Sequence, residues 1–144
     1  MTSNVKKAEE LYAAFARGDI PAVLGMCDAQ LQWRQAEGHP YQPDGAAWSG
    51  PQEVLEKLFM RIAADWDGFK VNVRAFRDAG DYVVVEGRYT GLYKPASRSL
   101  DAQMCHILCF QNGKLTRFQQ YMDTAQLQAV MAATVRGLGG SATA

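Results

Sequence analysis

Histidine is the side chain best suited to transferring protons near neutral pH, and this chain has two, His39 and His106. His106 lies in the apolar run 99–111, whose composition predicts a β-strand. On such a strand Met104, His106 and Leu108 share one face. A histidine in that setting is either a general acid or base, or a core residue whose ring bonds a backbone carbonyl. The residues leave both roles open.

The remaining reactive side chains form no catalytic or metal-binding pattern. The cysteines, Cys27, Cys105 and Cys109, include no C-x-x-C pair, so we expect buried thiols in a reducing cytoplasm. His39 lies in a loop rich in proline and glycine, where we expect it to be exposed to solvent. The sequence contains no phosphate-binding glycine loop and no nucleophile elbow. We therefore expect neither a metal nor another cofactor.

The balance of charges excludes two classes of partner. The chain of 144 residues carries 15 basic and 15 acidic side chains, so its formal net charge is zero. Nucleic-acid binders normally have a basic excess, and anionic membranes attract one, so we expect neither partner. Hydrophobic residues make up 48% and aromatic residues 10%, which suits a globular domain with a small, weakly polar ligand. No apolar run is long enough for a signal peptide or a membrane span, so we expect a cytoplasmic protein.

The first half of the chain has the apolar spacing of helices. One helix is predicted over 4–17, and Asp19 can cap a second, short one. Ser49 and Gln52 have the spacing of a capping box and begin a third helix, whose apolar face extends to Trp66. Before residue 66, only a short strand and a loop separate these predicted helices.

The second half of the chain has the apolar pattern of strands. Together with the short early strand, strands are predicted at 30–35, 69–74, 82–93, 99–111 and 114–122. Asn112-Gly113 is a strong hairpin signal between the last two. Asp123 can then cap a last helix that ends near Val135.

Helices that are segregated from an antiparallel sheet define an α+β fold. We expect a single domain over 1–136 and a flexible tail over 137–144. A strongly bent sheet would enclose a pocket against the helices, and pockets between layers are where small molecules bind.

Four segments of the chain resemble one superfamily. They are the helix pair Leu11-Tyr12-Ala-Ala-Phe15-Ala-Arg-Gly18-Asp19-Ile20, the helix start Trp48-Ser-Gly50-Pro51-Gln-Glu-Val54, the strand Asp81-Tyr-Val-Val-Val-Glu-Gly87-Arg-Tyr89-Thr-Gly91, and the hairpin that runs from Asn112-Gly113-Lys114 to Tyr121-Met-Asp123. Through them the chain resembles the SnoaL-like polyketide cyclase and ketosteroid isomerase-like group of the nuclear transport factor two-like superfamily. The resemblance covers about residues 5–130 and implies a conical, strongly bent antiparallel sheet packed on three to four helices.

The resemblance also implies a homodimer that pairs through the outer face of the sheet. An apolar outer face favours such a dimer, and the residues expected there are apolar: Cys105, Ile107, Cys109 and Tyr121.

The resemblance further implies a site in which two acids are replaced by amides. The proton-transferring aspartate of ketosteroid isomerases falls on or near Gln35, and the acidic base of SnoaL-type cyclases falls on Gln120. The isomerase oxyanion-hole aspartate and the cyclase histidine both fall on His106. The isomerase tyrosine falls on Leu11, with Tyr12 one residue away. Because an amide cannot accept a proton at neutral pH, His106 is left as the titratable group of the expected site.

Strand parity and the resemblance together define the expected pocket. His106 is its general acid or base, and Gln120 orients the substrate. The expected wall consists of Trp33, Gln35, Met104, Leu108 and Phe118, closed by Phe15, Phe59 or Trp66 from the helices. The ligand would be a small hydrophobic molecule, carbonyl-containing or polyketide-like. Two functions stay open: isomerisation, cyclisation or dehydration of that compound, or its binding without catalysis.

Overall fold

The first helix lies within one residue of its predicted bounds, and the second begins after the predicted cap Asp19. The structure is a computed structural model that describes residues 3–132. Helix α1 spans Asn4–Ala16 and is capped by Ser3, whose hydroxyl accepts a hydrogen bond from the Lys6 amide at 3.1 Å. Helix α2 spans Ile20–Gly25, and the carboxylate of Asp19 accepts from the Ala22 amide at 3.2 Å. These caps fix the residues at which the two helices begin.

The third helical segment is continuous and begins after Ser49, as predicted, but its capping bonds and its end differ from the prediction. It comprises α3 (Gly50–Val54), the π-helical turn η1 (Leu55–Phe59) and α4 (Met60–Asp65). The predicted capping box of Ser49 and Gln52 is wrong: the Ser49 side chain makes no capping bond, and its backbone amide donates to Glu53 at 2.8 Å. The prediction that the apolar face of this helix extends to Trp66 is also wrong, because Trp66 is the first residue of a strand.

The sheet has six strands in the order β2-β1-β6-β5-β4-β3. Their bounds are β1 Cys27–Arg34, β2 Trp48–Ser49, β3 Trp66–Ala79, β4 Tyr82–Tyr93, β5 Arg98–Gln111 and β6 Lys114–Met122. Strands β3 to β6 form an antiparallel meander, and β1 pairs with β6 in parallel. The sequence patterns predict β4 and β6 to the residue, but not β2 or the parallel pairing of β1.

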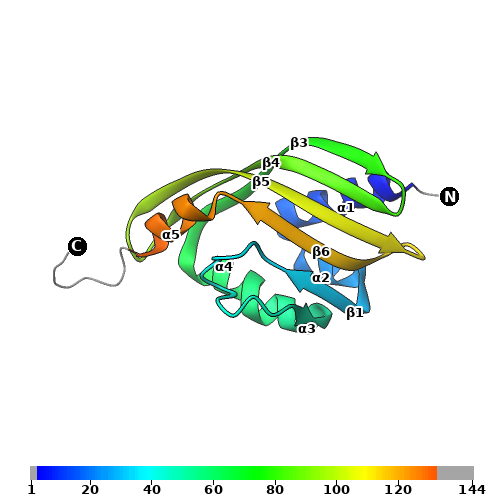
Figure 1. Cartoon of the computed structure of the whole chain (residues 1–144), viewed down its shortest axis with the longest axis horizontal. Coiled ribbons are helices and arrows are strands. Elements are labelled where there is room, and N and C mark those ends of the chain that lie inside the picture. Colours follow the sequence, from blue (N-terminus) through cyan, green and yellow to red (C-terminus); the bar gives the residue numbers. More distant parts are fainter. Residues whose placement is uncertain (1–2, 133–144) are drawn as a thin grey trace.

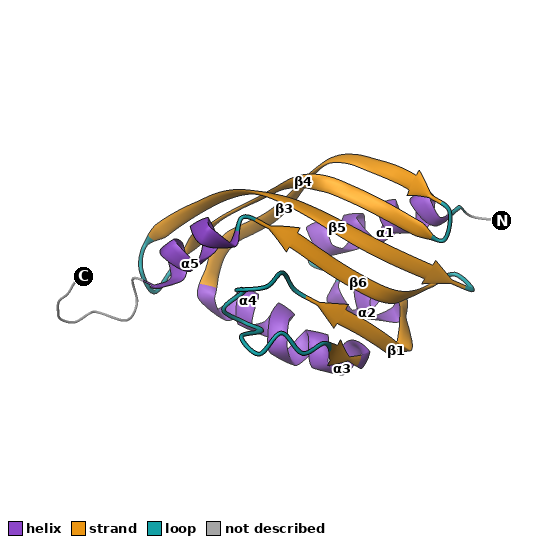
Figure 2. Ribbon diagram, viewed as in Figure 1, coloured by secondary structure: helices purple, strands orange, loops and turns teal. Residues whose placement is uncertain are grey.

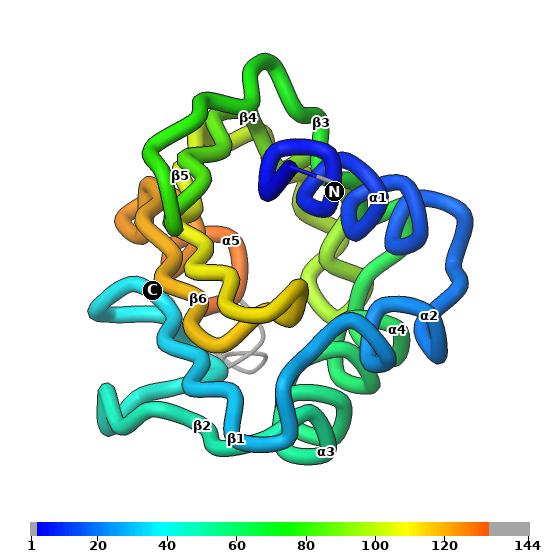
Figure 3. Tube along the Cα trace, turned by 90° about the vertical axis from the view of Figure 1, so that its right-hand side faces the viewer, coloured from blue at the N-terminus to red at the C-terminus, as the bar shows by residue number. Residues whose placement is uncertain are grey.

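The sheet bends around the helices and forms a half-open roll. In Figures 1 and 2, α1, α2 and the α3–α4 segment lie along one side of the sheet, and α5 (Thr124–Ala132) lies at one end of it. Viewed from the side, the strands form an arc whose open side is closed by α1, α2 and α4 (Figure 3). The α+β fold with a bent antiparallel sheet is therefore confirmed.

The last helix begins as predicted. The Asp123 carboxylate accepts a hydrogen bond from the Gln126 amide at 3.1 Å, as an N-cap does. The predicted end of this helix at Val135 and the predicted tail over 137–144 lie outside the described residues. None of the described helices is both long and apolar enough to cross a bilayer.

The two faces of the sheet differ as strand parity predicts. On β5, Met104, His106 and Leu108 are buried on the concave side, whereas Cys105 and Ile107 are partly exposed on the convex side. Tyr121, beside Cys105 on β6, is exposed. Cys27 and Cys109 are buried, as expected of the thiols, whereas Cys105 is partly exposed. Cys109 does not share the exposure of the outer face predicted for it, since it lies next to an irregularity in the pairing of β5 with β6.

Candidate functional site

A cavity of about 80 Å³ lies between the concave face of the sheet and the helices. Its wall includes eight of the ten side chains that the sequence predicted for it: Phe15, Trp33, Gln35, Phe59, Trp66, His106, Phe118 and Gln120. The other two, Met104 and Leu108, are buried but do not line it. They flank His106 on the same strand face. That face of the strand extends beyond the cavity. Strand alternation therefore predicts which face a side chain lies on, but not whether it lines the cavity.

The apolar part of the wall is built from stacked rings. The ring of Trp33 on β1 lies parallel to that of Phe118 on the neighbouring β6, with centroids 3.7 Å apart. Phe59, from the helical segment, meets Trp33 edge-on at 5.9 Å, and Phe15 from α1 packs on Phe59 at 5.6 Å. Rings from two strands and two helical segments therefore form one rigid, water-excluding surface.

His106 is held at both of its ring nitrogens by tyrosines. The hydroxyl of Tyr12, from α1, lies 2.5 Å from Nδ1, and the hydroxyl of Tyr89, from β4, lies within hydrogen-bond distance of Nε2. Burial lowers the pKa of His106 to about 3, so the ring is neutral near pH 7. A neutral imidazole has one N–H and one lone pair, so it donates to one of these phenols and accepts from the other.

The sequence patterns did not predict the two tyrosines as partners of His106. The resemblance placed the isomerase tyrosine on Leu11, but Leu11 and Tyr12 both line the cavity, and Tyr12 is the residue that bonds His106. Tyr89 carried a signal that could have found it. It shares a strand face with Val83, Val85 and Gly87, all of which are buried. Burial raises the pKa of both phenols, so each keeps its proton.

Gln120 orders this row of hydrogen bonds. Its Oε1 accepts from the Ala36 backbone amide at 3.2 Å, so its amide nitrogen faces Tyr89 and donates to the hydroxyl at 2.8 Å. Gln120 and His106 are opposite each other on β6 and β5, and the Tyr89 hydroxyl is the group that they share. The row from Ala36 through Gln120, Tyr89 and His106 ends at Tyr12.

In this row of hydrogen bonds one phenol O–H has no acceptor among the described residues. If Tyr89 donates to Nε2, then Nδ1–H donates to Tyr12, whose own proton has no acceptor among residues 3–132. If the ring is reversed, the proton of Tyr89 is the one left over. The Tyr89 hydroxyl already has two hydrogen-bond partners, Gln120 and His106, whereas the Tyr12 hydroxyl has one. Tyr12 is therefore the phenol better able to bond a further partner.

A second polar region lies where β1 runs into the loop that follows it. The indole N–H of Trp33 donates to Oε1 of Gln35 at 2.7 Å. Gln42 bonds back to the strand at both ends, accepting from the Gln35 backbone amide at 2.8 Å and donating to the Trp33 carbonyl at 3.3 Å. The loop is therefore folded against the sheet by its own side chains.

His39 lies in the cavity wall, so the expectation that it is exposed is wrong. Side chains accept hydrogen bonds from the backbone amides of the loop that contains His39. His39 itself takes part, because its Nδ1 accepts from the Tyr41 amide at 3.0 Å. Burial, followed by the nearby charge of Arg61, lowers the pKa of His39 to about 4. The ring is therefore neutral near pH 7, with its proton on Nε2.

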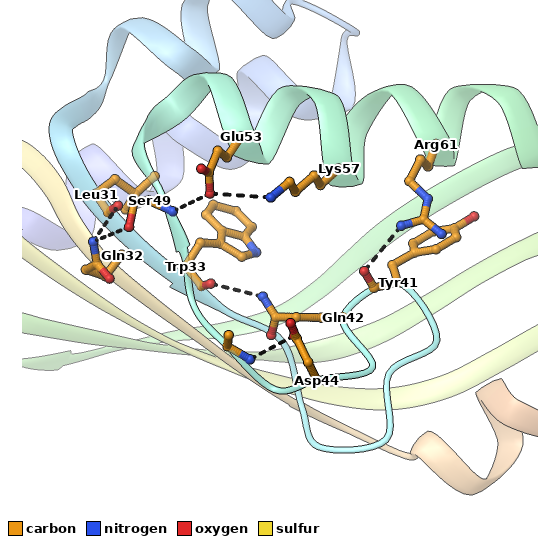
Figure 4. A network of polar contacts seen from close by, with 11 residues as sticks. Leu31, Gln32, Trp33, Tyr41, Gln42, Asp44, Ser49, Glu53, Lys57 and Arg61 are labelled. Carbon is orange, nitrogen blue, oxygen red and sulfur yellow. Dashed lines mark hydrogen bonds and ion pairs between the residues drawn. The ribbon is translucent and has the colours of Figure 1, made fainter.

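Tyr41 fastens the same loop to α4. Its hydroxyl donates to Asp65 at 2.6 Å and accepts from the Trp66 indole at 3.2 Å. Arg61 lies over the Tyr41 ring, 4.0 Å from its centroid, and also donates to its carbonyl (Figure 4). Burial, followed by the bond to Asp65, raises the pKa of Tyr41. No sequence signal pointed to this contact, because its partners are far apart along the chain.

The described wall of the cavity contains no carboxylate. Its titratable groups are neutral near pH 7: two histidines with lowered pKa and tyrosines with raised pKa. Residues 3–132 also hold no group of three or more side chains placed to bind a metal ion. The arrangement can donate hydrogen bonds from uncharged groups inside an apolar enclosure.

Comparisons with known proteins agree with this architecture. The sequence profile of the SnoaL-like domain matches residues 8–118. A search of curated proteins found no significant match. An NTF2-like protein from Burkholderia thailandensis is 27% identical with a TM-score of 0.85, covering 91% of this chain and 98% of its own.

Two further solved structures share the fold. An NTF2-like protein of unknown function from Burkholderia pseudomallei is 25% identical with a TM-score of 0.82, covering 92% of this chain and 100% of its own. TerC, co-crystallized with polyporic acid, is 22% identical with a TM-score of 0.78, covering 90% of this chain and 98% of its own.

Proposed function

This chain belongs to the SnoaL-like domain family, and from that premise we propose that it binds a small, mostly apolar molecule through a carbonyl or enol oxygen. The oxygen would accept a hydrogen bond from Tyr12 at the polar end of the cavity. Stacked rings would enclose the rest of the molecule. Apolar walls with a few convergent polar groups are typical of small-ligand sites.

The observation that carries this proposal is the phenol proton left over at the end of the row. Tyr12 is partly buried, and an unpaired donor that is shielded from water costs up to about 1–3 kcal/mol, which a ligand oxygen placed at Tyr12 would recover. The raised pKa of Tyr12 supports its role as a donor, because the phenol stays protonated throughout the physiological range. Such a site favours a ketone over a hydrocarbon of the same shape.

His106 serves in this proposal as a positioning residue. Its lowered pKa and its two phenol partners argue against a free general base at neutral pH. A neutral ring between two hydroxyls instead sets which phenol proton faces the cavity. This differs from the proton transfer expected from the sequence.

A second candidate function is favoured by the same row of donors. Preorganised donors aimed at a carbonyl oxygen stabilise the charge that develops when an enol forms. The isomerisation, cyclisation or dehydration of a carbonyl or polyketide-like compound would use that effect. The amides at Gln35 and Gln120 weigh against it, since neither can accept the substrate proton.

Binding is tested with two probes of nearly equal shape, 4-ethylacetophenone and 1,4-diethylbenzene. The wild type should bind the ketone about 3–10-fold more tightly by isothermal titration calorimetry, the range expected for one hydrogen bond. The Tyr12→Phe variant should lose that preference. Tyr82→Phe is the matched control, because Tyr82 is 40% exposed and outside the cavity wall. A Tyr12→Phe protein that kept the full preference would refute the role of Tyr12.

Catalysis is tested separately with the same ketone in heavy water. Enol formation exchanges the protons next to the carbonyl for deuterium, which proton NMR measures directly. Exchange that the wild type accelerates and Tyr12→Phe does not would favour the second candidate. Binding without accelerated exchange would favour the first.

A further inference from the structure

We infer that the cavity contains a second donor subsite, formed by the Gln35 amide and the His39 ring, so that its ligand carries two hydrogen-bond-accepting oxygens. The inference rests on the proposed function, since it concerns a second oxygen on the molecule held by Tyr12. It narrows the ligand class to small, mostly apolar compounds with two carbonyl-type oxygens.

The orientation of Gln35 is determined by its neighbour. An indole N–H can only donate, so the atom that it meets at 2.7 Å must be the oxygen of the Gln35 amide. The nitrogen of that amide then faces away from Trp33. The side chain is 3% exposed and lines the cavity, and no acceptor for its nitrogen exists among residues 3–132.

The orientation of His39 is determined in the same way. Its Nδ1 accepts from the Tyr41 amide at 3.0 Å, and the neutral ring therefore carries its proton on Nε2. His39 is 6% exposed and lines the same cavity. Within the described part of the chain, its Nε2–H has no acceptor either.

The other buried polar side chains are paired at both ends, which sets these two apart. Gln42 and Gln120 each use their oxygen and their nitrogen, and His106 uses both ring nitrogens. Buried polar groups are almost always hydrogen-bonded, so two unpaired donors in one cavity wall need an explanation. A ligand oxygen provides one.

The subsite has a definite chemical preference. Both free groups are N–H donors, so the subsite suits a carbonyl, carboxylate or phenolate oxygen and disfavours an ammonium group. A site with buried donors discriminates strongly against analogues that lack the matching oxygen.

The inference is tested with disubstituted benzenes that differ in the number and the spacing of their carbonyl groups. 1,4-Diacetylbenzene and 1,3-diacetylbenzene have two carbonyls at different spacings, 4-ethylacetophenone has one, and 1,4-diethylbenzene has none. Titration calorimetry of the wild type should give at least one diacetyl isomer an affinity about 3–10-fold above that of 4-ethylacetophenone. This comparison needs no variant and so does not depend on the folding of one.

The subsite itself is tested with Gln35→Met, which removes the donor and also the acceptor of the Trp33 indole N–H while keeping the approximate volume. Because the lost acceptor can weaken binding of every probe, the measured quantity is the ratio of the diacetyl affinity to the 4-ethylacetophenone affinity, and this ratio should fall to about one in the variant. Gln32→Met is the matched control, because Gln32 lies on β1, three positions before Gln35, and is exposed. A gain that survives in Gln35→Met overturns the assignment of the subsite.

The outcomes separate this inference from the proposed function. If the wild type prefers 4-ethylacetophenone to the hydrocarbon but neither diacetyl isomer binds more tightly, the second subsite is refuted and the proposed function stands. Such a result would mean that solvent satisfies the two donors. If the wild type does not prefer the ketone to the hydrocarbon, the proposed function fails and this inference fails with it.

Discussion

At the level of single residues, the character of His106 is set by its neighbours. In water a histidine titrates near pH 6.5, and here burial lowers the pKa to about 3. Two phenols use its nitrogens, and one of these phenols is oriented by Gln120. Gln120 therefore acts at a distance: it touches neither His106 nor Tyr12 by a hydrogen bond, yet it orders the row that ends at Tyr12.

Gln120→Leu should destabilise the protein by about 1–3 kcal/mol, because the Ala36 amide and one side of the Tyr89 hydroxyl would lose their partner while buried. Urea denaturation measures the change. Gln119→Leu is the control, since the neighbouring glutamine is partly exposed and points to the other face. Equal losses in the two variants would contradict a special role for the Gln120 amide.

At the level of helices and strands, β4 determines where Tyr89 meets His106. Two residues before Tyr89, a side chain at Gly87 would put its Cβ 3.0 Å from Cα of Val73 on β3, and closer still to the carbonyl oxygen of Asn72. The pairing of β3 with β4 is irregular at this point, between Val73 and Ala75. The two strands thus approach more closely than a Cβ permits, and glycine allows the bend.

Gly87→Ala should lower the free energy of unfolding by about 1–3 kcal/mol, since backbone atoms must move to admit the methyl group. Gly25→Ala is the control. That glycine ends α2, and a Cβ added there would have nothing within 4 Å, so the change should be neutral or slightly stabilising. Thermal unfolding followed by circular dichroism compares the two. A Gly87→Ala variant as stable as Gly25→Ala would disprove the close approach.

At the level of the whole molecule, two buried neutral histidines make stability depend on pH. The pKa is about 3 for His106 and about 4 for His39, and both lie near 6.5 in the unfolded chain. Between these values the unfolded state binds more protons than the folded state. Stability is therefore complete above about pH 6.5 and falls as the pH decreases below it.

The free energy of unfolding should fall between about pH 7 and pH 5 by on the order of 1–2 kcal/mol for each histidine. His106→Gln removes one of these groups and keeps a donor and an acceptor, so the fall should become clearly smaller. Urea titrations at several pH values measure the slope for both proteins. Identical slopes would show that His106 does not titrate below its ordinary range.

The outer face of the sheet leads to a prediction about assembly. Tyr121 is 56% exposed there, beside the partly exposed Cys105. We expect the chain to form a dimer through this face and to elute at about twice 15.9 kDa. Tyr121→Lys should give a monomer, because burying an unpaired ammonium costs several kcal/mol. Met60→Lys, at an equally exposed position on α4, should stay dimeric. A wild type that elutes as a monomer at micromolar concentration would contradict the prediction.

Local sequence patterns were enough to predict the elements that depend on neighbouring residues alone. A run of β-branched and aromatic residues predicted the bounds of β4, and the return from the hairpin signal predicted those of β6. Asn112-Gly113, both with positive φ, form the hairpin that sets the register of β5 with β6. That register places His106 opposite Gln120. The motifs also identified the fold, because they record which elements follow one another.

The surroundings of the pocket residues, in contrast, depend on how distant elements pack. Tyr12 is separated from His106 by 94 positions, and whether Leu11 or Tyr12 meets the ring depends on a rotation of α1 that no periodicity fixes. The burial of His39 depends on a loop that folds back through Gln42 and Tyr41. The pKa of each histidine follows from burial and from partners on other elements, and so it emerges only when the chain is packed.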